Sequence, residues 1–111
     1  MAKQQRVYSA TAREALVLMG KQIQLARKKR QISAAELAER IGIARSTLWR
    51  IEQGEPGVEI GLVFEAAVLT GVPLFVEAPG RLASQIDRVD DKLALLPASV
   101  RNKSKDVKDD F

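Results

Sequence analysis

Two short helices joined by a tight turn are the feature that most constrains the fold of this 111-residue chain. Between Ser33 and Gly54, apolar side chains recur twice at helical spacing, and each run ends at a glycine. Ser33 and Glu36 have the spacing of a capping box, in which each side chain binds the backbone amide of the other at a helix N-terminus. Gly42 and Gly54 suit the left-handed backbone conformation in which many helices end. This pattern predicts helices over residues 34–41 and 45–53.

The residues around the turn predict that these two helices cross at a sharp, fixed angle. Ala38 is small at the expected crossing point, and Gly42 permits the tight turn. Four apolar residues form the wedge that sets the angle: Ile41, Ile43, Leu48 and Ile51. Such an angle lets the second helix enter a DNA major groove about 12 Å wide while the first lies across the phosphate backbone. The segment is therefore a candidate helix-turn-helix.

Helical periodicity on both sides of this segment predicts three more helices. One covers residues 11–30 and has five apolar positions on one face: Ala15, Leu16, Met19, Ile23 and Ala26. Another covers residues 59–70 and closes at Gly71, and a fifth begins near Pro79 and carries an apolar stripe to Leu96. Residues 72–76 are β-branched or aromatic but few, which leaves a short strand and an extended connector both open. The predicted fold class is all-α, with five helices.

The length of the chain suits one compact core with terminal extensions, and is too short for two domains of typical size. We expect an N-terminal arm over residues 1–10 and a helix-turn-helix domain over 11–76, in which 72–76 is the candidate strand. A C-terminal helix over 77–96 is left for contact with a second copy or a partner. Residues 97–111 have almost no apolar periodicity, which is typical of a flexible tail.

The composition argues against catalytic and metal-binding chemistry. The chain has no cysteine and no histidine, so it lacks thiolate nucleophiles, imidazole bases, disulfides and the usual zinc ligands. Its acidic residues are scattered over polar helix faces rather than gathered beside a cleft signal. We therefore expect no enzymatic activity, no metal and no cofactor. No apolar run approaches the roughly 18 residues of a membrane span and no secretory signal is readable, so we expect a cytoplasmic protein without membrane contact.

The charge is distributed unevenly along the chain. Residues 1–30 carry eight Lys or Arg and one Glu, whereas residues 58–96 carry three basic and six acidic residues. This asymmetry is expected of a face that binds a polyanion, joined to a part with another role. A solvated basic helix would have the same charge, so the charge by itself does not separate the two interpretations.

Residues 20–71 resemble the phage repressor and Cro family of helix-turn-helix regulators, also called the Xre family. The resemblance lies in small, glycine, apolar and charged positions: Glu36-Leu37-Ala38, Ile41-Gly42, Leu48, Ile51-Glu52 and Gly54. It implies a five-helix lambda-repressor-like domain that binds DNA sequence-specifically and represses transcription. Members of the family pair an Arg late in the first helix with a Glu late in the third as a buried ion pair, and Arg27 and Glu52 occupy those places.

The same resemblance implies contacts with DNA. Four residues stand where the family's recognition helix meets base edges: Arg45, Ser46, Trp49 and Arg50. Ser33 and Thr47 match positions that usually touch phosphate. Arg suits bidentate contact with guanine, so G·C pairs are expected in the operator. Trp49 is equally consistent with a side chain that covers neighbouring core.

Two departures from the family pattern affect how the domain would hold DNA. Ala44 replaces the Ser or Thr that commonly caps the recognition helix, a loss of about 1 kcal/mol unless another group substitutes. Ala34 replaces a Gln that binds phosphate at the start of the preceding helix. The phosphate would then be bound by helix amide groups or by three basic residues: Lys28, Lys29 and Arg30.

A single unit of this size offers little contact area for DNA. Helix-turn-helix proteins of this class present two recognition helices about 34 Å apart on a palindromic operator, so we expect a homodimer. Its interface could be residues 72–76, paired as a strand across the two-fold axis, or the apolar stripe of the fifth helix. We favour both elements acting together.

The end of the chain carries a second resemblance. Its motifs are Leu96-Pro97, Val100-Arg101 and Asp109-Asp110-Phe111, together with Gly71-Val72-Pro73-Leu74-Phe75. They resemble the ending of HipB-like antitoxins, which are encoded beside HipA-type serine/threonine kinases. The resemblance implies a repressor that also binds and restrains a kinase toxin, with a tail that orders against the kinase. Two alternatives stay open: a stand-alone Xre-type repressor with an inert tail, and a protein-bridging module built on the same scaffold.

Overall fold

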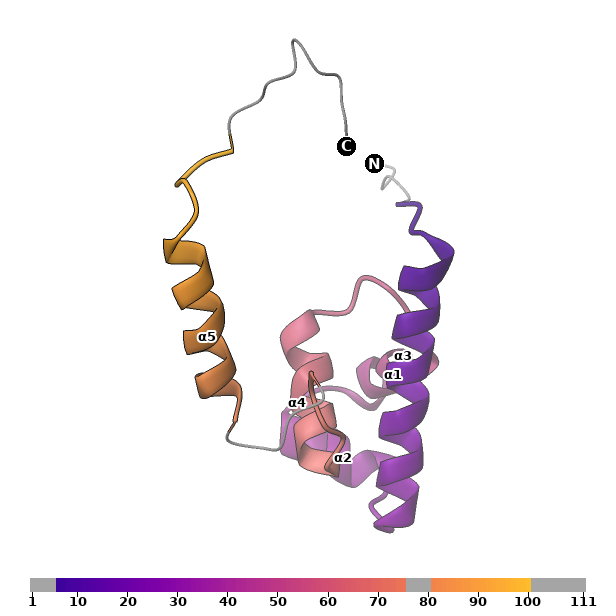
Figure 1. The fold of residues 1–111 in the computed structure, drawn as a ribbon. Coiled ribbons are helices and arrows are strands. Elements are labelled where there is room, and N and C mark those ends of the chain that lie inside the picture. Colours follow the sequence, from indigo (N-terminus) through magenta and orange to yellow (C-terminus); the bar gives the residue numbers. More distant parts are fainter. Residues whose placement is uncertain (1–5, 76–80, 101–111) are drawn as a thin grey trace. The chain divides into compact units, whose positions relative to one another are not determined.

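The computed structural model describes residues 6–75 and 81–100 (Figure 1). These residues form five α-helices and contain no strand, which confirms the all-α fold class. The helices are α1 (Ala10–Lys29), α2 (Ala34–Ile41), α3 (Arg45–Gln53), α4 (Ile60–Thr70) and α5 (Leu82–Ala94). The chain divides into two units at Glu77, so that α1 to α4 form the first unit and α5 belongs to the second.

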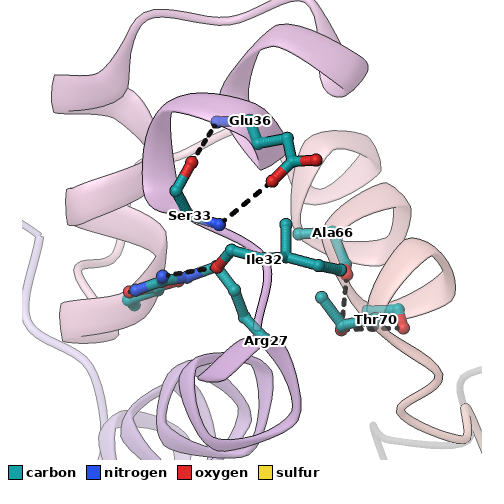
Figure 2. A network of polar contacts seen from close by, with 8 residues as sticks. Arg27, Ile32, Ser33, Glu36, Ala66 and Thr70 are labelled. Carbon is teal, nitrogen blue, oxygen red and sulfur yellow. Dashed lines mark hydrogen bonds and ion pairs between the residues drawn. The ribbon is translucent and has the colours of Figure 1, made fainter. Parts of the chain in front are cut away.

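The predicted helix ends around the turn are confirmed. The Ser33 hydroxyl accepts from the Glu36 amide at 3.0 Å, and the Glu36 carboxylate accepts from the Ser33 amide at 3.3 Å (Figure 2). Gly42 and Gly54 both end their helices in the left-handed conformation, with φ of 87° and 74°. The α2–turn–α3 segment therefore has the local geometry that its capping and glycine signals predict.

The core of the first unit lies where the four helices meet. α1 packs against α3 and α4, and α2 packs against the same two helices. The buried apolar residues come from all four helices and the segment after α4: Ile23, Leu37, Ala38, Leu48, Ile51, Ala66, Ala67 and Val72. Of the predicted wedge, Leu48 and Ile51 are buried, while Ile41 and Ile43 are partly buried and pack against this core.

Two glycines let α1 approach the end of α3 backbone to backbone. A Cβ atom on Gly20 would lie 2.5 Å from the Ile51 carbonyl oxygen and 2.6 Å from that of Glu52. A Cβ atom on Gly54 would lie 2.5 Å from the Cα atom of Val17. Since real Cβ atoms do not approach other atoms so closely, both positions require glycine.

The end of α4 is stabilised by buried polar contacts. The Thr70 hydroxyl donates to the Ala66 carbonyl at 2.8 Å, inside the protein (Figure 2). Gly71 follows in the left-handed conformation with φ of 83°, and the guanidinium group of Arg30 lies directly against it. A cation at this place complements the negative end of the α4 dipole.

The segment after α4 is a connector over its described part, 72–75. Val72 is buried and Leu74 makes one isolated β-bridge contact, but no strand forms there. Phe75 packs edge-on against Phe64 of α4, with ring centroids 6.0 Å apart. In this single chain residues 72–75 therefore form a connector; a strand that pairs with a second copy stays a prediction, and Val76 lies outside the described part.

The second unit contains α5, which is shorter than the helix predicted from Pro79 to Leu96. It covers Leu82–Ala94, and none of its residues is buried. Pro79 lies outside the described residues, as do residues 1–5 of the N-terminal arm, Arg101 and the terminal Asp109-Asp110-Phe111. None of the helices in the described residues is long and apolar enough to span a membrane.

Candidate nucleic-acid interface

A hollow of about 420 Å³ opens where α1, the start of α2 and one face of α3 meet. α3 supplies most of its lining, α1 supplies two residues and α2 one. The lining residues are Gln24, Arg27, Ala34, Arg45, Ser46, Leu48, Trp49 and Glu52. Three of the four residues predicted to meet base edges, Arg45, Ser46 and Trp49, therefore come together at one surface.

The side chains of α3 divide into an inner and an outer set. Leu48 is buried in the core, whereas Arg45 and Ser46 are exposed and Trp49 keeps 57% of its surface exposed. Arg45 and Trp49 are one turn apart, which places both on the same face of the helix. Arg45 forms no ion pair with any residue in the described part of the chain. Its positive charge is thus available to a ligand at the outer face of α3.

Beneath this surface, a buried ion pair joins α1 to α3. The Nε atom of Arg27 donates to one carboxylate oxygen of Glu52 at 2.7 Å, and a second guanidinium nitrogen donates to the other oxygen at 3.0 Å. A third nitrogen donates to the Ile32 carbonyl at 3.0 Å, in the loop before α2 (Figure 2). The hydrogen bonds that Arg27 donates to Glu52 raise the pKa of Arg27 against the opposing effect of burial. One side chain therefore ties α1, the loop and α3 together.

Comparison with known protein families shows that residues 18–75 match the helix-turn-helix domain family, over more than half of the chain. The chain belongs to the helix-turn-helix domain family. Comparisons with curated proteins and with solved structures gave no significant match. The family match supports a DNA-binding regulator, with α2 and α3 as the two helices of the motif.

The start of the second helix of the helix-turn-helix differs from that of the first. Ala44 has φ of −72° and ψ of 152°, close to the −74° and 158° of Ser33, but provides no side-chain cap. The first amide groups of α3 consequently have no side-chain acceptor at the cap position. They lie beside Arg45 and Ser46, so the helix start adds partial positive charge to the same surface.

Arg50, the fourth predicted base-contacting residue, does not line the hollow. Its Nε atom lies 3.3 Å from a carboxylate oxygen of Glu55, and both side chains are more than two-fifths exposed. Such an exposed pair contributes only about 0–1 kcal/mol, so a phosphate or a base could replace Glu55 as the partner of Arg50. Thr47 is half-buried, and Ser33 is exposed with its hydroxyl engaged in the capping box.

The three basic residues at the end of α1 have different surroundings. Lys28 follows Gln24 by one turn, on the side of α1 that borders the hollow. Lys29 follows the exposed Leu25 by one turn and is itself exposed. Arg30 instead lies against Gly71 at the end of α4. Of the three, Lys28 is therefore best placed to reach a phosphate beside α3.

Sequence reasoning missed Gln24. It lines the same hollow as Arg45, Ser46 and Trp49. The available signal was its position three residues before Arg27, which puts both on one face of α1. Since an amide carries donors and an acceptor, Gln24 can bind either a phosphate or a base edge.

Proposed function

We propose that this protein is a cytoplasmic, sequence-specific transcriptional repressor that binds a palindromic operator as a dimer and has no catalytic activity. The observation that supports this function best is the exposure of Arg45, Ser46 and Trp49 on one face of α3. The Arg27–Glu52 ion pair underneath holds that helix at a fixed angle to α1. A rigid helix whose first residue, Arg45, has no ion-pair partner in the described part of the chain is suited to entering a major groove.

The proposed contacts follow from the chemistry of each side chain. Arg45 donates two hydrogen bonds to guanine O6 and N7, and Trp49 packs on a sugar or a thymine methyl group. Lys28, Lys29 and the first amide groups of α3 bind phosphates and position the helix. Arg50 joins them by exchanging Glu55 for DNA.

Selection from a pool of random DNA duplexes, followed by sequencing, tests this function. We expect an enriched inverted repeat whose half-sites contain G·C pairs. Affinity for the selected duplex should fall by orders of magnitude as salt rises, since each phosphate contact releases counterions. An unenriched pool, or binding that does not change with salt, would instead favour the protein-bridging alternative.

A pair of variants separates base contacts from general charge effects. Arg45→Ala should weaken binding to the selected duplex by about 1–3 kcal/mol and leave binding to random DNA almost unchanged. Arg40→Ala is the matched control, because Arg40 is exposed, pairs with Glu36 within α2 and does not line the hollow. Equal losses for Arg45→Ala on selected and random DNA would contradict base recognition by Arg45.

As a second function, we propose that the protein restrains a HipA-like serine/threonine kinase as its antitoxin. This proposal rests on the resemblance of the C-terminal motifs. It is also supported by the exposure of residues 97–100, which include Pro97 and Val100, the latter 94% exposed. A segment with so few contacts of its own is free to order against a partner.

Co-expression with the neighbouring genes tests the antitoxin function. The full chain should retain a protein in high salt that mass spectrometry identifies as a HipA-like kinase, and should reduce its autophosphorylation. A chain ending at Leu96 should bind the operator as well as the full chain but retain the kinase poorly. Recovery of the repressor alone would favour the stand-alone alternative, and equal restraint by the shortened chain would contradict the role of the tail.

A further inference from the structure

Gln24 brings a side-chain amide from α1 to the hollow beside α3. The residue is partly buried and belongs to the lining of the hollow. Its amide forms no hydrogen bond with any residue in the described ranges, 6–75 and 81–100. Two N–H donors and one carbonyl oxygen are therefore free to bind a ligand that enters the hollow.

The charges around the hollow favour an anion as that ligand. Arg27 and Glu52 both line it, but they bind each other at 2.7 and 3.0 Å, so their charges compensate. Arg45 also lines it and forms no ion pair within the described part of the chain. Lys28 follows Gln24 by one turn of α1 and adds a second positive charge beside the hollow. An amide binds either a base edge or an anion, and this surplus of positive charge selects the anion.

The width of a DNA groove leads to the same choice. A major groove about 12 Å wide admits one α-helix, which is itself about 10–12 Å across with its side chains. When α3 lies in the groove, α1 stays outside it, and the surface between the two helices faces the sugar-phosphate backbone at the groove edge. The hollow has a volume of about 420 Å³. Since a water molecule takes roughly 30 Å³ of liquid volume, a phosphodiester group fits into this space.

We propose that the hollow receives one phosphate group of the operator backbone and that the Gln24 amide donates a hydrogen bond to it from α1. This inference rests on the proposed function, because it assigns a ligand to the surface that carries Arg45. Phosphate contacts fix the register and orientation of a protein on DNA but carry no sequence information directly. Gln24 is therefore a positioning residue, which sets how α3 lies in the groove while the side chains of α3 contact the bases.

Binding to duplexes that carry single methylphosphonate groups tests this contact. Each duplex has the sequence that the wild-type chain selects, with one phosphate in turn replaced by a group that lacks the negative charge. We expect Gln24→Ala to weaken binding to the unmodified duplex by about tenfold, because a hydrogen bond to a charged group is lost. At one position of the scan, the methylphosphonate should weaken binding of the wild-type chain about tenfold more than binding of Gln24→Ala.

Gln22→Ala is the matched control, because Gln22 is exposed on the same helix and does not line the hollow. It should bind every duplex as the wild-type chain does, and circular dichroism shows whether each variant stays folded. The salt dependence of binding gives a second readout. Gln24→Ala should leave it unchanged, since a neutral amide releases no counterion, whereas Gln24→Lys should keep the contact and steepen the salt slope by about one.

Three results would overturn this inference and leave the repressor function intact. The first is wild-type affinity of Gln24→Ala for the selected duplex. The second is an equal effect of each methylphosphonate on the wild-type and Gln24→Ala chains, which would show that Gln24 contacts no phosphate. The third is a lost base preference at one position when Gln24→Ala is used to select from random duplexes, which would show that Gln24 contacts a base edge. A wild-type chain that enriches no sequence would contradict the repressor function, and this inference with it.

Discussion

Arg27 shows how much of the first unit's geometry depends on single side chains. Its guanidinium group donates to both oxygens of Glu52 and to the Ile32 carbonyl, so three donors serve two separate elements. Both side chains are buried, and each charge is compensated only by the other. A buried pair of this kind specifies orientation more than it stabilises, because desolvation offsets much of the attraction.

Removing one partner of the Arg27–Glu52 pair should lower the unfolding free energy far more than replacing both partners with apolar residues. Glu52→Ala leaves the Arg27 charge buried without a counter-ion, and we expect a loss of about 3–5 kcal/mol in unfolding free energy. The double variant Arg27→Met with Glu52→Leu should lose clearly less. Urea unfolding measures the unfolding free energy of the single and the double variant. A double variant at least as unstable as Glu52→Ala would show that the pair contributes net stability.

The pKa of Arg27 also predicts how this stability depends on pH. Because the pKa rises on folding, its contribution is complete below the unfolded pKa and is lost only as pH rises through the folded one. Arg is effectively always protonated in unfolded chains, so Arg27 should cause no loss of stability between about pH 7 and pH 10. Thermal unfolding across that range, compared with the double variant, measures this directly.

Ala44 stands at the cap position of α3 and provides no side-chain acceptor there. Its backbone conformation almost equals that of Ser33, whose hydroxyl caps α2. Ala44→Ser should therefore accept a hydrogen bond from the Thr47 amide and raise the unfolding free energy by about 1 kcal/mol. Ser33→Ala should lower it by a similar amount. If Ala44→Ser gave no gain while Ser33→Ala did cause a loss, the start of α3 would differ from the cap geometry described here.

At the scale of elements, the contact between α1 and α3 decides how the face of α3 that carries Arg45, Ser46 and Trp49 is held. The two helices approach at Gly20 and Gly54, where backbone meets backbone without an intervening side chain. The Arg27–Glu52 pair lies between these helices as well. The close approach and the ion pair together fix the angle between α1 and α3, because both constrain these two helices.

Two glycine substitutions test this close approach. In Gly20→Ala the new methyl group would collide with carbonyl groups of α3, and since backbone cannot yield cheaply we expect a loss of about 3 kcal/mol or more. Gly61→Ala is the control: it lies in α4 with open space around the added atom and should gain about 0.5 kcal/mol. Chemical unfolding followed by Trp49 fluorescence measures both. Equal stability of the two variants would contradict the α1–α3 contact.

At the scale of the whole molecule, the buried core belongs to the first unit. Among the described residues, the buried apolar side chains of the core come from α1 to α4 and Val72, whereas no residue of α5 is buried. The first unit therefore has the core needed to fold without the second unit.

Shortening the chain tests whether the first unit folds alone. A chain that ends at Glu77 should keep the helix content of α1 to α4 and cooperative thermal unfolding, because its core is complete. Loss of cooperative unfolding in the shortened chain would show that the second unit contributes to the core.

Much of the fold could be predicted because its signals act over a few residues. Local geometry sets the capping box at Ser33 and the left-handed conformation of Gly42 and Gly54. It also sets the helical spacing of the apolar residues within each helix, such as those around Ile23 in α1. Helix limits were less predictable: α5 begins at Leu82 rather than near Pro79. The segment after α4 could not be decided, because a strand depends on a pairing partner that local sequence does not specify.

The sequence by itself determined that the chain is all-α, with a helix-turn-helix whose second helix bears Arg45, Ser46 and Trp49. Only the tertiary structure decided how the polar residues around that helix are used. It directs Arg30 to Gly71, engages Arg50 with Glu55, and brings Gln24 to the same hollow as Arg45. The reason is physical: capping and periodicity are set within one or two turns, whereas the neighbours of a long side chain depend on the angle at which distant helices cross.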